Sequence, residues 1–230
     1  MRHKSYKKGL ITNIVVMLGL LCISGCMGTI DWVQLTPPEL PSKVFKPSSG
    51  MSKVVFVKTG RAVGGALGNI YDGPDMIGQV IKNSFFQYEC KPGKRFFGYK
   101  MHVINPAAMP YNFVEAELLP DRVYYINVVN LLAGKKGVNR FSIVRPLYEG
   151  CQHDICKDWH KLLKNLPETT LTPKFNELVA RDKKRVDDWN NKHPEYQYTY
   201  ESNLEDWKKD INVPKFTVLP EYGYLEPIKF

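Results

Sequence analysis

Side chains between residues 53 and 146 alternate between apolar and polar, and this pattern restricts the fold more than any other feature of the chain. The clearest stretch is Lys94–Ile104, with Phe97 and Tyr99 on one side and Lys100 and His102 on the other. Alternation with a period of two is typical of a β-strand that is buried on one face only. We therefore predict a half-buried strand here, with Lys100 facing water.

Further segments of this region show the same alternation or a short apolar run, and each is predicted as a strand: Val54–Val57, Met76–Ile81, Phe85–Cys90, Phe113–Leu118, Val123–Val129 and Phe141–Val144. Turn sequences such as Asp72-Gly73-Pro74, Lys91-Pro92-Gly93 and Leu119-Pro120-Asp121 separate them, and no helical pattern lies between them. Short strands without intervening helices favour a sandwich over βαβ units. We expect a mainly β fold in which residues 53–147 form an immunoglobulin-like antiparallel β-sandwich.

The period changes after residue 147, and residues 148–230 are predicted as a helical and extended segment that packs on the sandwich. One helix is expected over 154–166, capped by Asp154, and a second from Thr172 as cap and Pro173 as first residue to about 193. A third, short helix is expected over 203–210. The tail, residues 213–230, is rich in proline and aromatic residues, so we expect it to be extended and to cover the sandwich or an edge strand.

The apolar run Leu10–Ile23 is about 14 residues long, shorter than the roughly 20 that a membrane-spanning helix requires. Four basic residues and no acidic one precede it, as in a secretion signal. The following sequence, Ile23-Ser24-Gly25-Cys26, resembles the lipobox of bacterial lipoproteins. That resemblance implies that residues 1–25 are a cleaved signal peptide and that Cys26 carries a covalent lipid. A plain signal peptide or an uncleaved anchor is the alternative.

The resemblance to lipoproteins also implies a location. In enteric-type bacteria an Asp after the lipidated cysteine keeps a lipoprotein in the inner membrane, and this chain has Met27 there. By analogy we expect an outer-membrane protein that faces the periplasm. Residues 26–52, with Pro37, Pro38 and Pro41, are predicted as a proline- and serine-rich tether.

The positive charge of the chain belongs partly to the signal. Removing residues 1–25 takes away four of the 32 basic residues and none of the 23 acidic ones, so the net charge falls from +9 to +5. The remaining basic clusters, such as 135–136, 183–185 and 208–209, have acidic neighbours and indicate solvated faces. We therefore expect no nucleic-acid partner, while an anionic envelope surface stays open.

Three short motifs in the β region point to a family. They are Tyr71-Asp72-Gly73 leading into Ile77-Gly78, the turn Cys90-Lys91-Pro92-Gly93-Lys94, and Val123-Tyr124-Tyr125-Ile126. With these motifs the region resembles a family of uncharacterised bacterial envelope lipoproteins with small β-sandwich domains. The resemblance implies fold and location. It carries no activity, and the long C-terminal extension of this chain departs from the pattern.

Four potential zinc ligands lie within ten residues: Cys151, His153, Cys156 and His160. A disulfide between Cys151 and Cys156 is the preferred interpretation, because an exported chain folds in an oxidising compartment. Free thiols and a zinc site remain as alternatives. Cys90, beside Phe86 and Tyr88, is expected to be a buried, unreactive thiol.

Nothing else in the sequence carries a catalytic pattern. Gly60–Gly68 lacks the terminal Gly-Lys-Ser/Thr of a phosphate loop and is interpreted as a flexible loop, and Glu115 and Glu117 are interpreted as solubilising side chains. We therefore expect a non-enzymatic binding or structural module, without a cofactor apart from the lipid, whose partner is an envelope protein or a cell-wall component. An exported hydrolase or metalloprotein that uses Cys151–His160 is the alternative.

Overall fold

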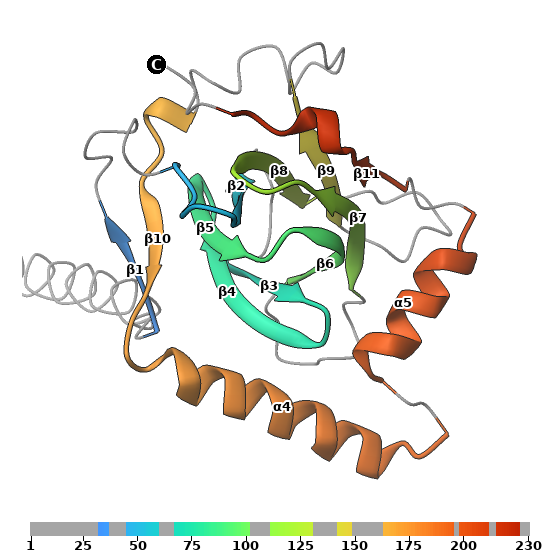
Figure 1. Cartoon of the computed structure of the whole chain (residues 1–230). Coiled ribbons are helices and arrows are strands. Elements are labelled where there is room, and N and C mark those ends of the chain that lie inside the picture. The colour runs from blue at the N-terminus through green and yellow to red at the C-terminus, as the bar shows by residue number, and fades with distance from the viewer. Residues whose placement is uncertain are drawn as a thin grey trace, which may run out of the picture. The chain divides into compact units, whose positions relative to one another are not determined.

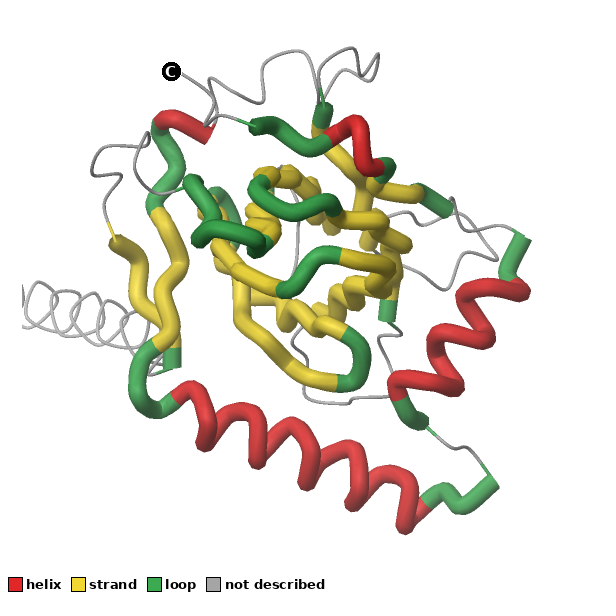
Figure 2. Tube along the Cα trace, viewed as in Figure 1, coloured by secondary structure: helices red, strands yellow, loops and turns green. Residues whose placement is uncertain are grey.

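The structure is a computed structural model of the chain, and it describes residues 32–36, 45–59, 67–101, 111–130, 142–148, 163–195, 198–211 and 215–225. All of these residues belong to one compact unit, Trp32–Phe230. Figures 1 and 2 show strands at the centre of this unit, with helices beside them. No described helix combines the length and the apolarity that a membrane span requires.

The described strands form two sheets. Sheet A has the order β1 (Val33–Thr36), β10 (Glu168–Leu171), β5 (Ser84–Cys90), β2 (Ser52–Lys58), β8 (Arg122–Asn130) and β9 (Ser142–Leu147). Sheet B has the order β11 (Thr217–Val218), β7 (Asn112–Leu118), β6 (Gly93–Met101), β3 (Leu67–Asp72) and β4 (Asp75–Ile81). The prediction of a mainly β fold is confirmed.

The sheets are mixed, so the prediction of purely antiparallel strands is wrong. β2 and β8 run parallel, from the pair Ser52↔Arg122 to the pair Lys58↔Val128, and the short β11 runs parallel to β7. Parallel neighbours need a crossover connection, and here the chain between β2 and β8 forms β3 to β7. Alternation along a strand reveals which side chains are buried, but it does not reveal the neighbour or its direction.

The main core lies between the two sheets, because one cluster of buried side chains draws on both. Its members are Val54, Phe56, Ile70, Val80, Phe86, Cys90, Phe97, Tyr99, Val114, Ala116, Leu118, Tyr124, Ile126, Val128 and Val218. A second cluster, which includes Phe45, Val55 and Leu163, covers the other face of sheet A. The central strand β2 is therefore buried on both faces, which explains its unbroken apolar run.

Three of the predicted turns connect strands at one end of the sheets. Gly73 and Gly93 have φ angles of 59° and 122°, and Asp121 has a φ angle of 57°. These are left-handed conformations, which glycine adopts without steric cost and which aspartate tolerates. The turns join β3 to β4, β5 to β6 and β7 to β8.

Two helices follow β10 along the chain, α4 (Phe175–Lys192) and α5 (Tyr200–Lys209). The predicted cap and first residue of α4, Thr172 and Pro173, are wrong, because Lys174 is the N-cap and makes no capping side-chain hydrogen bond. The backbone N–H of Thr172 instead donates to the carbonyl of Trp32, at 3.0 Å, and extends the pairing of β1 with β10. α5 begins earlier than predicted because Thr199 and Ser202 form a capping box.

Regions predicted as tether and tail contribute to the sheets. β1 and the buried Phe45 lie within residues 26–52, and β11 pairs with β7. After the short helix η3 (Pro220–Tyr222), the backbone of Tyr224 bonds to that of Val123 in both directions at 2.9 Å. Of the predicted helix 154–166, only residues 163–166 are described. Leu163 is helical and buried there.

Candidate functional site

Most residues singled out in the sequence lie outside the part that the structure describes. These are Cys26, Cys151, His153, Cys156 and His160. Among the described residues, no group of three or more His, Cys, Asp or Glu side chains could hold a metal ion. Cys90 is described, and its predicted burial as a free thiol is confirmed. Burial raises the pKa of this thiol to about 11, which keeps it protonated and unreactive at neutral pH.

Two other predictions concern sheet B. Gly68, expected in a flexible loop, instead lies in β3, where an added Cβ atom would overlap the ring of Tyr99. Glycine is required at this position because the tyrosine packs directly on the backbone. Glu115 is half-buried and Glu117 exposed, on the face of β7 that points away from the main core.

The same outer face of sheet B carries an unexpected buried charge. Lys100 is only 2% exposed, so the prediction that it faces water is wrong. The reason is that α4 contributes a partner from far along the chain. Asp182, in the middle of α4, is 8% exposed and places Oδ1 at 4.0 Å from Lys100 Nζ.

Aromatic rings surround the ammonium group of Lys100. The Nζ atom lies 5.3 Å from the ring centroid of Tyr111 and 5.1 Å from that of Tyr198, and it has no hydrogen-bond partner among the described residues. Burial lowers the pKa of Lys100 to about 8, with Asp182 acting in the opposite direction and Arg185 adding to the decrease. The ammonium is therefore held by an ion pair and two ring faces, at the cost of its hydration.

The second oxygen of Asp182 extends the contact into sheet B. It accepts a hydrogen bond of 2.9 Å from the hydroxyl of Tyr71, which in turn accepts one of 3.4 Å from Asn69 Nδ2. Asn69 Oδ1 accepts a bond of 2.6 Å from Gln79 Nε2. Burial, Tyr111 and Asp182 raise the pKa of Tyr71 well above its usual value, so the phenol keeps the proton that it donates. We call these five residues, Lys100, Asp182, Tyr71, Asn69 and Gln79, the helix clamp.

A cluster of aromatic residues encloses the helix clamp. Its buried members are Tyr71, Tyr111, Phe113, Tyr198, Tyr200 and Trp207. Tyr71 and Tyr111 meet edge to face at 4.8 Å between centroids, and Phe113 packs in the same way on Tyr200 at 5.2 Å. Because these rings come from both sheet B and the segment around α5, they hold that segment on the sheet.

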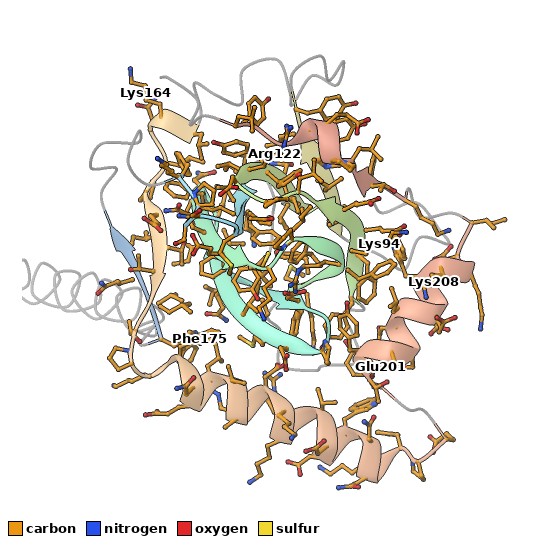
Figure 3. All side chains as sticks on the ribbon, in the orientation of Figure 1. Lys94, Arg122, Lys164, Phe175, Glu201 and Lys208 are labelled. Carbon is orange, nitrogen blue, oxygen red and sulfur yellow. The ribbon has the colours of Figure 1, made fainter. Side chains whose placement is uncertain are left out.

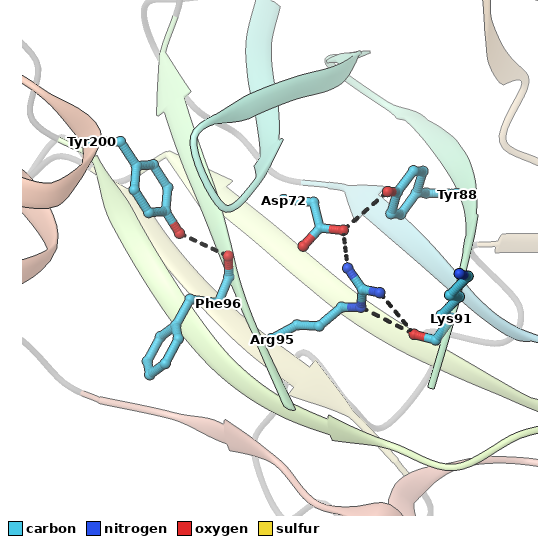
Figure 4. A network of polar contacts seen from close by, with 6 residues as sticks. All are labelled: Asp72, Tyr88, Lys91, Arg95, Phe96 and Tyr200. Atoms are coloured by element: carbon cyan, nitrogen blue, oxygen red, sulfur yellow. Dashed lines mark hydrogen bonds and ion pairs between the residues drawn. The ribbon is translucent and has the colours of Figure 1, made fainter. Parts of the chain in front are cut away.

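A second polar network lies beside this cluster, at the end of the sheets that carries the three turns (Figure 4). Asp72 Oδ2 accepts hydrogen bonds from Arg95 Nη1 and, at 3.0 Å, from the hydroxyl of Tyr88. Arg95 also donates twice to the carbonyl of Lys91, at 3.1 and 3.0 Å. The hydroxyl of Tyr200 donates to the carbonyl of Phe96 at 2.8 Å. The bonds of Arg95 to Lys91 fix the turn between β5 and β6, and the bond of Tyr200 joins α5 to β6.

Another buried lysine lies on the inner side of the sheets. Lys58, the last residue of β2, is 2% exposed and donates a hydrogen bond of 2.7 Å to the hydroxyl of Tyr99. Burial lowers the pKa of its ammonium to about 7. Asn127, on the neighbouring β8, donates to Thr59 Oγ1 at 3.0 Å. At the Lys58 end of β2 a buried polar group therefore lies on each face of sheet A, with Lys58 on the inter-sheet face and Asn127 on the opposite face.

One sequence signal could have revealed the helix clamp. The apolar stripe of α4 runs through Leu178, Val186 and Trp189, and Asp182 occupies the position in that stripe between Leu178 and Val186. A carboxylate in the middle of an apolar stripe is rarely buried without a partner. The partner, however, could not be identified, because Lys100 looks like an ordinary water-facing residue of an amphipathic strand.

The charges of the helix clamp pair with one another and join α4 to sheet B, which is a structural role. Comparison with known proteins adds no further assignment: no family model matches the chain, and neither a curated protein nor a solved structure matches it significantly. The chain's own residues are thus the basis for what we propose below.

Proposed function

We propose that this chain is a lipid-anchored protein of the bacterial cell envelope that binds another envelope protein or a cell-wall component and catalyses no reaction. The lipid is attached at Cys26, after removal of residues 1–25, and holds the protein at the outer membrane on the periplasmic side. The folded unit is an immunoglobulin-like β-sandwich extended by its C-terminal segment. The core cluster that draws on both sheets supports this fold.

One observation carries the binding role, namely that three long connections between successive strands lie at the same end of the sheets. The pairs Ser52↔Arg122 and Gly93↔Leu118 place the tight turns 73–74, 91–92 and 119–121 at one end. The opposite end of the sheets is marked by the pairs Lys58↔Val128 and Gly68↔Met101. The strands that end or begin there flank three long connections, residues 59–66, 102–111 and 131–141. Long connections that leave one end of a rigid scaffold are where binding residues concentrate. We call this the long-connection end.

The test is crosslinking in living cells from matched positions. Lys82, in the turn between β4 and β5, is exposed at the long-connection end, and Lys91 is exposed at the opposite end. A photoreactive amino acid at position 82 should capture one envelope component, and the same residue at position 91 should not. Equal capture at both positions, or capture at neither, would overturn the assignment of the binding end.

A control variant tests the anchor. Cys26→Ala should leave the membrane fraction and lose the captured partner, because both depend on the lipid. If the variant stays in the membrane fraction as the wild type does, the lipid anchor is not what holds the protein. Stoichiometric zinc in protein purified without added metal would instead favour a metalloprotein built on Cys151–His160.

A further inference from the structure

The start of β1 is tied to the start of α4. The carbonyl of Trp32 accepts the backbone hydrogen bond from Thr172, and the guanidinium of Arg181 lies 4.4 Å from the centroid of the Trp32 ring. Figure 1 shows β1 beside β10, which leads through a short loop into α4. The point where the described chain begins is therefore next to the first half of this helix.

The covalent chain limits how far the anchor can be from this point. Trp32 is six residues after Cys26, and an extended chain spans at most about 3.6 Å per residue, so Cys26 lies within about 22 Å of Trp32. A lipid on Cys26 inserts its acyl chains in the bilayer, which holds the cysteine at the headgroup level. The surface around Trp32 then stays within about 22 Å of the membrane.

The exposed charges of α4 are unevenly distributed along the helix. From residue 174 to 184 the exposed charged side chains are Lys174, Glu177, Arg181, Lys183 and Lys184, four basic and one acidic. From residue 185 to 192 they are Asp187, Asp188 and Lys192. Asp182 does not offset the basic residues at the surface, because it is buried against Lys100. Three exposed basic side chains, Arg181, Lys183 and Lys184, thus lie together in the middle of α4, and the first of them contacts Trp32.

The packing of α4 on the strands does not account for these basic side chains. The buried residues Phe175, Leu178 and Asp182 define the face that packs on the strands, so the basic residues lie off that face. Figure 3 shows side chains of α4 that point away from the sheets. Leu171, just before the helix, adds an apolar side chain that is 38% exposed.

We infer that the middle of α4 lies against the membrane, with Arg181, Lys183 and Lys184 contacting the headgroups of anionic phospholipids. This inference rests on the proposed lipidation of Cys26, because the short link to Trp32 brings α4 to the bilayer. Basic residues near an anionic surface are attracted within a Debye length, which orients the anchored domain. The long connections would then be presented in a defined direction relative to the membrane.

The experiment uses the full lipidated protein in vesicles of phosphatidylglycerol and phosphatidylcholine, or of phosphatidylcholine alone. A water-soluble acylating reagent labels exposed amines, and mass spectrometry gives the labelling rate at each lysine. Lys183 and Lys184 should react about five-fold more slowly on anionic than on neutral vesicles. Lys94, an exposed residue of β6, serves as the internal control and should react equally on both.

A matched pair of variants tests the role of charge. Arg181→Gln with Lys183→Gln should restore fast labelling at Lys184 on anionic vesicles, whereas Lys82→Gln with Lys91→Gln should leave its protection unchanged. Equal labelling of Lys184 on both kinds of vesicle, with the lipid mass present on Cys26, would overturn the orientation and leave the anchor intact. Absence of the lipid mass would overturn both proposals.

Discussion

The layer between the two sheets and the layer between sheet B and α4 are built from different side chains. The first is almost entirely apolar, with Phe56, Phe97 and Ile126 at most 1% exposed. The second combines aromatic rings with the helix clamp, in which Lys100 and Asp182 form a buried ion pair. Hydrophobic burial is non-directional, whereas a buried ion pair satisfies its charges in one arrangement only. The comparison indicates that apolar packing stabilises the sheets and that polar pairing positions the helix.

The largest effect is expected in the inter-sheet layer. Phe97→Ala removes a ring that packs edge to face on Phe56, at 5.3 Å between centroids. We expect a loss of about 3–5 kcal/mol in the free energy of unfolding, from lost burial and the cavity that remains. Urea denaturation measures it. Leu119→Ala, at a side chain that is 38% exposed, is the control and should cost far less. Equal losses would contradict a core located between the sheets.

Next in size is the ion pair under α4. Asp182→Ala leaves the Lys100 ammonium buried without its carboxylate, and we expect a loss of about 3 kcal/mol. Asp188→Ala removes an exposed carboxylate from the same helix and should change stability by less than about 0.5 kcal/mol. Hydrogen exchange should show faster opening of α4 in the first variant and unchanged exchange in β2.

A double variant tests whether the two charges under α4 depend on each other. Lys100→Met combined with Asp182→Leu removes both charges and should recover most of the stability that Asp182→Ala loses, because no charge then remains buried. If the double variant is as unstable as the single one, the two charges are not coupled, and the comparison between the layers fails.

The buried amine of Lys58, in the inter-sheet layer, should make stability depend on pH. The folded state lowers the pKa of Lys58 from 10.5 to about 7, so between these values the folded protein binds fewer protons than the unfolded chain. Stability therefore rises with pH above 7 and has its lowest value below it, where the charged amine is buried. From pH 7 to 8.5 we expect Lys58 to contribute an increase of about 2 kcal/mol. Lys58→Met should lose that increase, and an unchanged slope would contradict the burial of the amine.

The smallest effect is expected at the start of α5. Thr199 accepts a hydrogen bond of 3.1 Å from the backbone of Ser202, so Thr199→Ala should cost about 1 kcal/mol. Thr199→Ser keeps the hydroxyl and should cost less. Hydrogen exchange of the first turn of α5 is the appropriate measurement. If Thr199→Ala instead speeds hydrogen exchange throughout the protein, the hydrogen bond of Thr199 does not act on α5 alone.

The two layers also differ in how far the sequence predicts them. Period-two alternation locates β5, β6 and β7, and short apolar runs locate β2 and β8. β1, β10 and β11 are too short to show a period. The burial of Lys100 depends on Asp182, which is far along the chain, and no local pattern connects them. The sequence does not reveal how the strands pair. It therefore does not show which connections lie at the same end of the sheets.

The most direct test of the proposed anchor is the mass of the N-terminal peptide of the protein extracted from bacterial membranes. The lipoprotein interpretation predicts a mature chain that begins at Cys26, with the mass of a covalent lipid on that residue. A chain that begins before or after this position, or an unmodified Cys26, would contradict the lipid anchor and the membrane orientation inferred from it.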